Sequence, residues 1–220
     1  GHTEFPHAAV AAHYQTVGRH GVRPHLVAML RNFHLDNRAH HVLGAWLPMT
    51  FDAQNGDYLS YVRLDYFDRV VRFDDAQRVD AFVAAAGMDL ALLEARALGR
   101  SAHASQVVRA RAATRVVTQL DRIAPDFALD PAVAAAGLAA LAQPCADYSS
   151  FASVAAEALN GVPDEIASAV RLTLLPTTRL HDEQMFIRCI QIFEGLYRQV
   201  ATPISPAIRE PRPGLTAGVK

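Results

Sequence analysis

The sequence is poor in lysine, cysteine and long apolar runs, and each scarcity excludes a class of protein. Its 220 residues include one lysine and carry a formal net charge of −1, so nothing favours a nucleic-acid or acidic-membrane partner. Two cysteines, Cys145 and Cys189, are too few for a disulfide framework or a zinc site. The longest apolar runs, such as "AVAAAGLAALA", are too short to cross a bilayer. We therefore expect a reduced, cytoplasmic protein with neither a membrane nor a nucleic-acid partner.

The local signatures of common enzyme classes are also missing. The sequence contains no zinc motif, no P-loop, no Rossmann fingerprint and no local signature of serine–histidine–aspartate catalysis. A helical bundle with two metal ions would show a pair of E-x-x-H motifs, and no such pair is present. The first residues, "GHTEFPHAAV", lack the charged and apolar regions of a signal peptide. What the chain does have is a 51% apolar composition, which is enough for a sizeable core.

Helical patterns dominate the chain, and prolines and glycines separate them. No stretch alternates as a strand would, so we expect an all-α fold of roughly eight to ten packed helices. The domain is predicted to cover residues 1–202, with a Pro-rich extended tail over 203–220. The expected helices include 57–71, 75–87, 88–99, 102–123 with Ser101 as its cap, and 147–161.

The last long helix, "RLHDEQMFIRCIQIFEGLYRQV", combines an apolar pattern with many polar side chains. A three- and four-residue spacing predicts one buried face, made of Phe186, Cys189, Phe193, Leu196, Tyr197 and Val200. Asp182 and Glu183 in the first turn favour the positive end of the helix dipole, and Gln191 and Glu194 are expected at the edge of the buried face. Two interpretations stay open: the polar residues form a structural network, or the helix lines a site.

Two segments resemble the tryptophan 2,3-dioxygenase-like superfamily of histidine-ligated haem enzymes, which includes bacterial tyrosine hydroxylases. "HDEQMFIRCIQIFEGLY" is similar to the family helix that begins H-D-E and continues with F-I, Q and E-x-L-aromatic. The matching positions are His181, Asp182, Glu183, Phe186, Ile187, Gln191, Glu194 and Tyr197. "DYLSYVRLDYF" is similar to the family's Y-x-x-Y-L-x-L-D segment through Tyr58, Tyr61, Leu64 and Asp65. The resemblance implies a haem-dependent oxygenase or hydroxylase that acts on tyrosine, a tryptophan-like amino acid or a related aromatic metabolite.

The chain also departs from the family pattern. More than 110 residues separate the two segments, which lie much closer together in the dioxygenases. Ile190 occupies the position of the family's distal histidine, and no histidine follows His181. Because a distal base is missing, mono-oxygenation is expected rather than ring cleavage of an indole.

The resemblance implies roles for particular residues. If haem is bound, one imidazole must ligate the iron, and the candidates among apolar neighbours are His41, His34 and His40, in that order. Phe186 and Ile190 would present an apolar wall to a flat ring, and Tyr58 and Tyr61 would stack on it or bond to it. An amino-acid carboxylate would need an arginine, for which Arg63 and Arg188 are the candidates. The expected partners are the aromatic substrate, dioxygen or peroxide, and further copies of the chain in a homo-oligomer.

A second hypothesis comes from another class. Ala-rich helices without a catalytic motif suit a non-catalytic helical ligand-binding or dimerisation domain equally well. A haem absorption band in the purified protein distinguishes the two.

Overall fold

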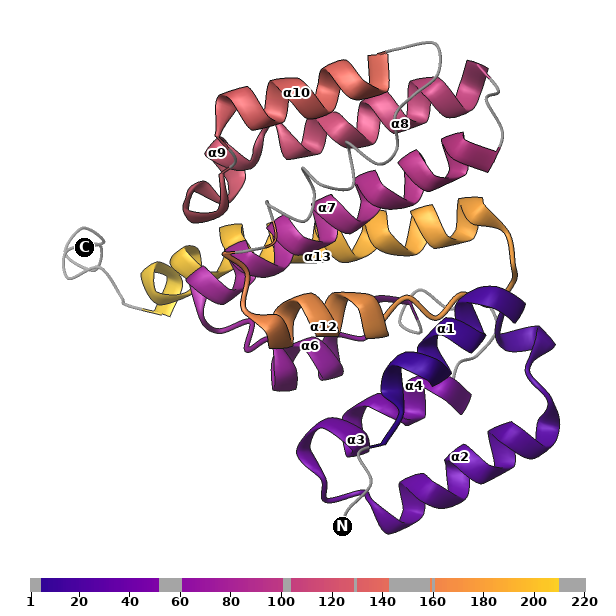
Figure 1. The fold of residues 1–220 in the computed structure, drawn as a ribbon. Helices are drawn as coiled ribbons and strands as arrows, with labels where there is room; N and C mark the ends of the chain where they lie inside the picture. Colours follow the sequence, from indigo (N-terminus) through magenta and orange to yellow (C-terminus); the bar gives the residue numbers. More distant parts are fainter. Residues whose placement is uncertain are drawn as a thin grey trace, which may run out of the picture.

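The computed structural model describes residues 5–51, 61–100, 104–128, 130–142, 159 and 161–209, and these residues form helices and no strand (Figure 1). The all-α prediction is therefore confirmed. The helices are α1 (His7–Val17), α2 (Pro24–Asp36), α3 (His41–Trp46), α4 (Pro48–Phe51), α6 (Leu64–Val70), α7 (Ala76–Arg100), α8 (Ala104–Val117), α9 (Leu120–Ile123), α10 (Pro131–Ala142), α12 (Asp164–Leu172) and α13 (His181–Arg209). Short 3-10 turns, η1 and η2, cover Arg19–Gly21 and Pro125–Phe127. None of the helices in these ranges has the apolar length that a transmembrane segment needs.

Helix α7 is the centre of the arrangement, because α13, α8 and α12 all pack on it (Figure 1). Its residues 81–88 are all buried, and five of these eight are alanine or glycine. Small side chains let neighbouring helices approach closely, and the larger core residues fill what remains. Phe82 on α7 contacts Phe67 and Phe73, with ring centroids 4.6 and 5.1 Å apart. The polar side chains discussed below are positioned around this helix.

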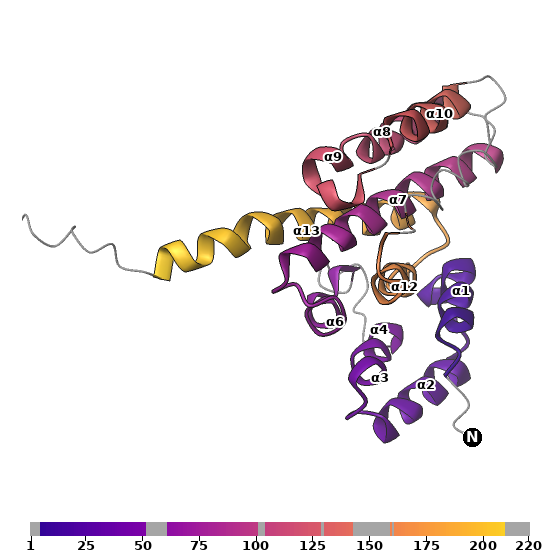
Figure 2. The ribbon, with the colours of Figure 1, turned by 60° about the vertical axis from the view of Figure 1, so that its left-hand side comes forward.

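Helices α1 to α4 form the N-terminal end of the molecule, and both ribbon views separate α2 and α3 from α13 by α12 and α6 (Figures 1 and 2). Trp46 joins this end to the rest, since its fully buried indole donates a hydrogen bond to the carbonyl of Leu172, at 3.0 Å. The Tyr14 hydroxyl likewise donates to the carbonyl of Thr50, at 2.8 Å. Buried aromatic rings with satisfied polar atoms therefore fix the N-terminal helices.

The prediction of two helices over 75–87 and 88–99 is wrong, since α7 runs through Gly87 without a break. A Cβ atom at this position would come within 2.9 Å of Cγ1 of Val116 on α8. Gly87 therefore permits the close approach of α8 and does not end a helix.

The predicted helix over 57–71 is also wrong in part. Arg63 adopts a left-handed backbone conformation with φ 51°, and α6 begins only after it. This conformation is uncommon for a residue with a Cβ atom, so Arg63 turns the chain sharply between Tyr61 and α6. Tyr58 and the rest of the first half of this segment lie outside the described residues.

The remaining boundary predictions have mixed outcomes. The expected helix over 102–123 divides into α8 and α9, and its proposed cap Ser101 and nearly all of the 147–161 helix lie outside the described residues. The extended tail predicted from residue 203 is wrong up to Arg209, because α13 continues through Pro203 and Pro206. Each proline removes only one N–H donor, and this end of α13 projects beyond the other helices, where water can hydrate the carbonyls left over (Figure 2).

Candidate functional site

Helix α13 buries the face opposite to the one that its apolar pattern predicts. Four residues of the predicted buried face are 48–63% exposed: Phe186, Phe193, Tyr197 and Val200. The residues that face the core include Arg188 and Gln191, both fully buried, and Gly195. A Cβ atom at Gly195 would lie 2.6 Å from Cγ2 of Val83, so this glycine lets α13 contact α7. The prediction of the buried face is therefore wrong for these four residues, whereas Cys189 and Leu196 are partly buried against the core. Paired polar groups and a glycine, together with isoleucines, face the core in place of the rings.

Arg188 is the centre of this buried polar network. Its Nε donates to Asp89 Oδ2 at 2.9 Å, its Nη2 donates to the carbonyl of Val170 at 3.0 Å, and its Nη1 donates to Gln191. Gln191 Nε2 in turn donates to the carbonyl of Tyr61, at 2.9 Å. A buried guanidinium is tolerated only with such partners. Asp89 therefore already pairs with Arg188 in the way that was predicted for a substrate carboxylate.

The three residues of the H-D-E motif each bind a different part of the fold. His181 Nε2 lies 2.9 Å from Glu94 Oε1 on α7, and Asp182 Oδ1 accepts from Arg109 Nη1 on α8 at 2.6 Å. Glu183 accepts hydrogen bonds from the backbone N–H groups of Thr177 and Thr178, at 2.6 and 2.7 Å. Burial alone would raise the pKa of Glu183, but these hydrogen bonds outweigh it and the pKa is lowered. The beginning of α13 is thus tied to α7, to α8 and to the segment before it.

Glu94 is a buried carboxylate with three side-chain partners. Besides His181 it accepts from Gln106 Nε2 at 2.7 Å and from Arg109 Nη2 at 3.1 Å. Burial would raise its pKa, but the hydrogen bonds and the adjacent positive charge lower it overall. Glu94 was not among the predicted site residues, although a single acidic residue within the mostly apolar stretch "LALLEARAL" was a visible signal.

Two cavities lie beside the cluster of Glu94, Arg109 and His181, and Asp182 lines both. One, of about 460 Å³, lies between α7, α8 and α13 and is mainly apolar; its lining includes Leu90, Ala113, Val116, Met185 and Cys189. The other, of about 630 Å³, is more polar; its lining includes Gln15, Arg96, Arg179, His181 and Gln184. Both volumes are in the range of small-molecule sites.

Tyr61, Phe186 and Ile190 lie together, as an aromatic site would require. The rings of Tyr61 and Phe186 meet edge to face with centroids 6.2 Å apart, and Ile190 belongs to the same apolar cluster as Tyr61. The Tyr61 hydroxyl donates to Glu183 Oε1 at 2.9 Å, and the Arg19 guanidinium lies 5.5 Å above its ring. Burial is the main reason that the pKa of Tyr61 is raised. The side chain of Tyr61 is therefore fixed, and Phe186, at 48% exposed, presents ring surface to the outside.

Arg63 lies beside this group with part of its guanidinium unused. Its side chain is 13% exposed, its Nε is buried, and Nε has no hydrogen-bond partner among the described residues. Nη2 lies 3.4 Å from Asp65 Oδ2, at the long end of the hydrogen-bonding range. Arg63 is therefore better placed to receive an anion than Arg188.

The three candidate axial histidines have different environments in the α2–α3 region. His34 is half-buried, its Nδ1 is buried without a partner among the described residues, and its ring lies 5.6 Å from that of Phe51. His40 caps α3 by accepting the N–H of Leu43 on Nδ1, at 3.2 Å, so a neutral ring carries its proton on Nε2. His41 is exposed. Within the ranges that the structure describes, no three histidine, cysteine or acidic side chains form a metal site.

A further cavity, of about 730 Å³, lies between the N-terminal helices and α6 and α12. Its lining includes three phenyl or phenol rings and two imidazoles, from Phe5, Phe33, Tyr66, His7 and His40. His40 is the only one of the three candidate histidines that lines it, and it does so with Nδ1 already used. The cavity lining includes none of Tyr61, Phe186 and Ile190.

Comparison with known proteins adds no relative. No family model matches the sequence, and no curated protein or solved structure is significantly similar to it. Function must therefore be argued from the residues themselves.

Proposed function

We propose that the chain binds a flat aromatic metabolite against Tyr61, Phe186 and Ile190, and acts on it as a haem-dependent oxygenase of the class that the resemblance implies. One observation carries the proposal. The two segments that resemble the family are more than 110 residues apart in sequence, yet they are joined through Tyr61, which binds Glu183 and accepts a hydrogen bond from Gln191. Three family-like positions of α13, Glu183, Phe186 and Gln191, all contact Tyr61.

Each residue of the group has a binding role. The exposed ring of Phe186 offers a stacking surface, and the hydrogen bond from Tyr61 to Glu183 prevents Tyr61 from rotating away. Ile190 contributes apolar surface and cannot transfer a proton, so the group orients a ring and does not act as a base. The left-handed backbone at Arg63 turns the chain there, and its unpaired Nε suits a ligand carboxylate.

Haem would supply the activation of dioxygen or peroxide in this class. A buried ring nitrogen without a hydrogen bond suits a metal ligand, so His34 is the first histidine to test, ahead of His40 and His41. However, both ribbon views place α2 and α13 apart, with α12 and α6 between them (Figures 1 and 2). The histidine that would hold haem and the rings that would bind the substrate are therefore on different helices of the described chain.

Calorimetric titration tests the aromatic site. We expect L-tyrosine and L-tryptophan to bind the wild-type protein, Phe186→Ala to weaken both, and Arg63→Ala to weaken the amino acids but not indole or phenol. Arg171→Ala, an exposed arginine on α12, is the matched control and should change nothing. If Phe186→Ala bound each of the four ligands as tightly as the wild type does, this result would refute the site.

A haemin titration of the wild type and of single alanine variants at positions 34, 40 and 41 tests the cofactor independently. The proposal requires a saturable Soret shift that one of the three substitutions abolishes. Aromatic binding without any Soret shift would instead favour the second hypothesis, a non-catalytic ligand-binding domain, for which the aromatic-lined 730 Å³ cavity is a specific supporting observation.

A further inference from the structure

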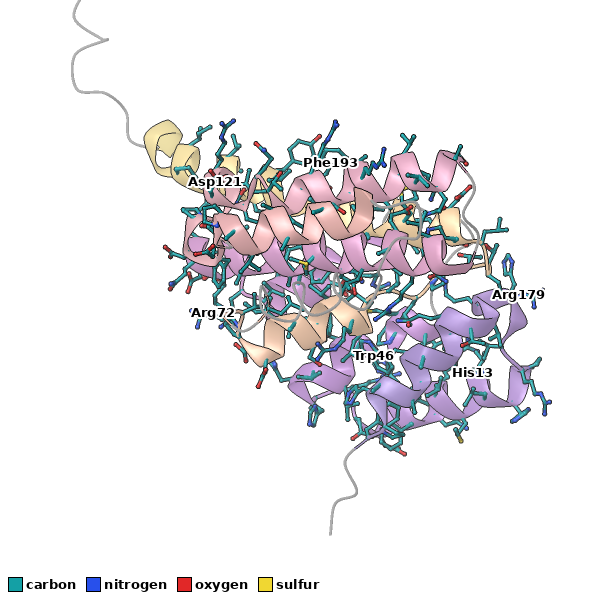
Figure 3. All side chains as sticks on the ribbon, turned by 45° about the horizontal axis from the view of Figure 1, so that its top comes forward. His13, Trp46, Arg72, Asp121, Arg179 and Phe193 are labelled. Carbon is teal, nitrogen blue, oxygen red and sulfur yellow. The ribbon has the colours of Figure 1, made fainter. Side chains whose placement is uncertain are left out.

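The outer face of α13 carries an apolar stripe that the described parts of the chain leave largely uncovered. Its residues are Phe186, Ile190, Phe193, Tyr197, Val200 and Ile204, and all except Ile190 are 47–63% exposed. Figure 3 shows Phe193 at the outer edge of the molecule, far from the buried Trp46. Contiguous exposed apolar surface of this kind marks an interaction site.

The spacing within the stripe indicates what kind of surface covers it. The intervals are four, three, four, three and four residues, which is the alternation of a and d positions in a coiled coil. Such a seam packs against another helix rather than against a sheet or a loop. From Phe186 to Ile204 it is about 27 Å long at the usual helical rise.

The same side of the molecule also contains a hollow. The apolar cavity of about 460 Å³ between α8 and α13 includes Met185 and Cys189, which border the stripe. At its other end α13 projects beyond the helices that pack on it (Figure 2). One face therefore combines a groove at its N-terminal part with a free, apolar helix end at its C-terminal part, as a contact between identical surfaces requires.

We infer that α13 packs antiparallel against α13 of a second copy of this chain, about a two-fold axis near residue 195. In this register Phe186 meets the partner's Ile204 and Phe193 meets the partner's Tyr197. Val200 lies over the partner's Ile190, which is largely buried in its own chain. The projecting end of each copy then lies along the groove between α8 and α13 of the other. The antiparallel direction also opposes the two helix dipoles, which a parallel pair would align.

Surface area and charge agree with self-association. A fully buried aromatic side chain covers about 150–250 Å², so five half-exposed apolar residues supply on the order of 500 Å² per copy. Two copies reach about 1,000 Å², the lower limit for a specific interface. Between residues 185 and 204 the charged residues are Arg188, Glu194 and Arg198, and Arg188 is fully buried. Repulsion between two such faces is therefore small.

This inference goes beyond the proposed function, since neither haem nor an aromatic ligand is needed for it. It would also place the partner's Ile204 beside the exposed ring of Phe186. Because Phe186 takes part in both proposals, the mass measurement below uses Phe193 and leaves the aromatic site intact.

Light scattering during gel filtration of the 220-residue chain gives the mass directly. At concentrations from about 1 to about 100 µM the wild type should approach twice the protomer mass of 23.9 kDa, with a concentration-dependent transition. Phe193→Glu should stay at 23.9 kDa throughout. Leu35→Glu, which places the same charge on a 51% exposed apolar residue of α2, should dimerise like wild type. A monomeric wild type, or a dimer that Phe193→Glu leaves intact, would overturn the inference.

Disulfide trapping tests the direction, in a background with Cys145 and Cys189 replaced by alanine. Phe186→Cys combined with Ile204→Cys should give a covalent dimer on oxidation, because the two positions lie about 27 Å apart within one helix and can bond only between copies. Phe186→Cys alone should remain monomeric on a denaturing gel. Efficient crosslinking of that single variant would indicate a parallel pair and contradict the antiparallel register.

Discussion

The inner face of α13 buries charged and polar side chains, whereas its outer face exposes aromatic ones, which is the reverse of what hydropathy suggests. The inner face packs on α7 through Arg188, Gln191 and Gly195, whereas the outer face exposes Phe193 and Tyr197. The inner polar groups are stable there because each nitrogen of the Arg188 guanidinium donates to an acceptor nearby, including a carboxylate. The buried side also carries Ile187 and Ile192, so the comparison teaches that in this helix hydrogen-bond partners as well as hydropathy decide which side is buried.

Removing the central cation should break the inner face and give the largest effect. Arg188→Ala leaves Asp89 and Gln191 without their partner, so we expect a loss of about 3–5 kcal/mol in the free energy of unfolding, measured by urea denaturation. Arg171→Ala should stay within about 0.5 kcal/mol. If Arg188→Ala were as mild as this control, the buried network would not hold α13 in place.

Adding one methyl group to the inner face should have the next largest effect. In Gly195→Ala the new Cβ would lie 2.6 Å from Cγ2 of Val83, and relief of this overlap should cost about 1–3 kcal/mol in thermal or urea unfolding. Gly161→Ala is the matched control, because its Cβ would meet nothing closer than Phe127 at 3.8 Å. Equal stabilities of the two variants would show that α13 does not approach α7 so closely.

Acidification should weaken the same helix through Glu94. Its folded-state pKa lies below the ordinary value of 4.5, so the carboxylate contributes stability above that pH and loses it as pH falls through the folded pKa. Glu94→Gln should therefore be less stable than wild type at neutral pH, by about 1–3 kcal/mol, and the difference should shrink below about pH 4. A difference that is the same at pH 7 and pH 3 would contradict the assignment of Glu94 as an ionised partner of Arg109 and His181.

Polar substitution on the outer face should have the smallest effect on the isolated chain. Val200→Ser replaces an exposed apolar side chain with a small polar one. At concentrations where the protein is monomeric, we expect the free energy of unfolding to change by no more than about 0.5 kcal/mol. Urea denaturation of dilute protein measures it. A loss of several kcal/mol would mean that Val200 is buried within the single chain.

Sequence patterns predicted the helices better than the faces that they bury. The all-α class follows from helical periodicity and from prolines and glycines, which are local properties. Gly87 was interpreted as a helix end because its real neighbour, Val116, is contributed by a distant segment. The same limit explains why the buried face of α13 was predicted wrongly. No local pattern reveals that Arg188 will donate hydrogen bonds to Asp89 and to the carbonyl of Val170. The nearness of Tyr61 to Phe186 was accessible only through the resemblance to a family, and the role of that pair stays a prediction.

Hydroxyl-radical footprinting at several protein concentrations tests the central claim, that the outer face of α13 is open in the single chain and is covered by a second copy. In dilute protein Phe193 and Tyr197 should be oxidised readily, whereas Tyr66 and Phe67, which are fully buried, should be protected. In concentrated protein Phe193 and Tyr197 should become protected while the exposed Met29 of α2 does not change. Protection of Phe193 and Tyr197 at every concentration would contradict the account, because it would mean that the chain covers this face by itself.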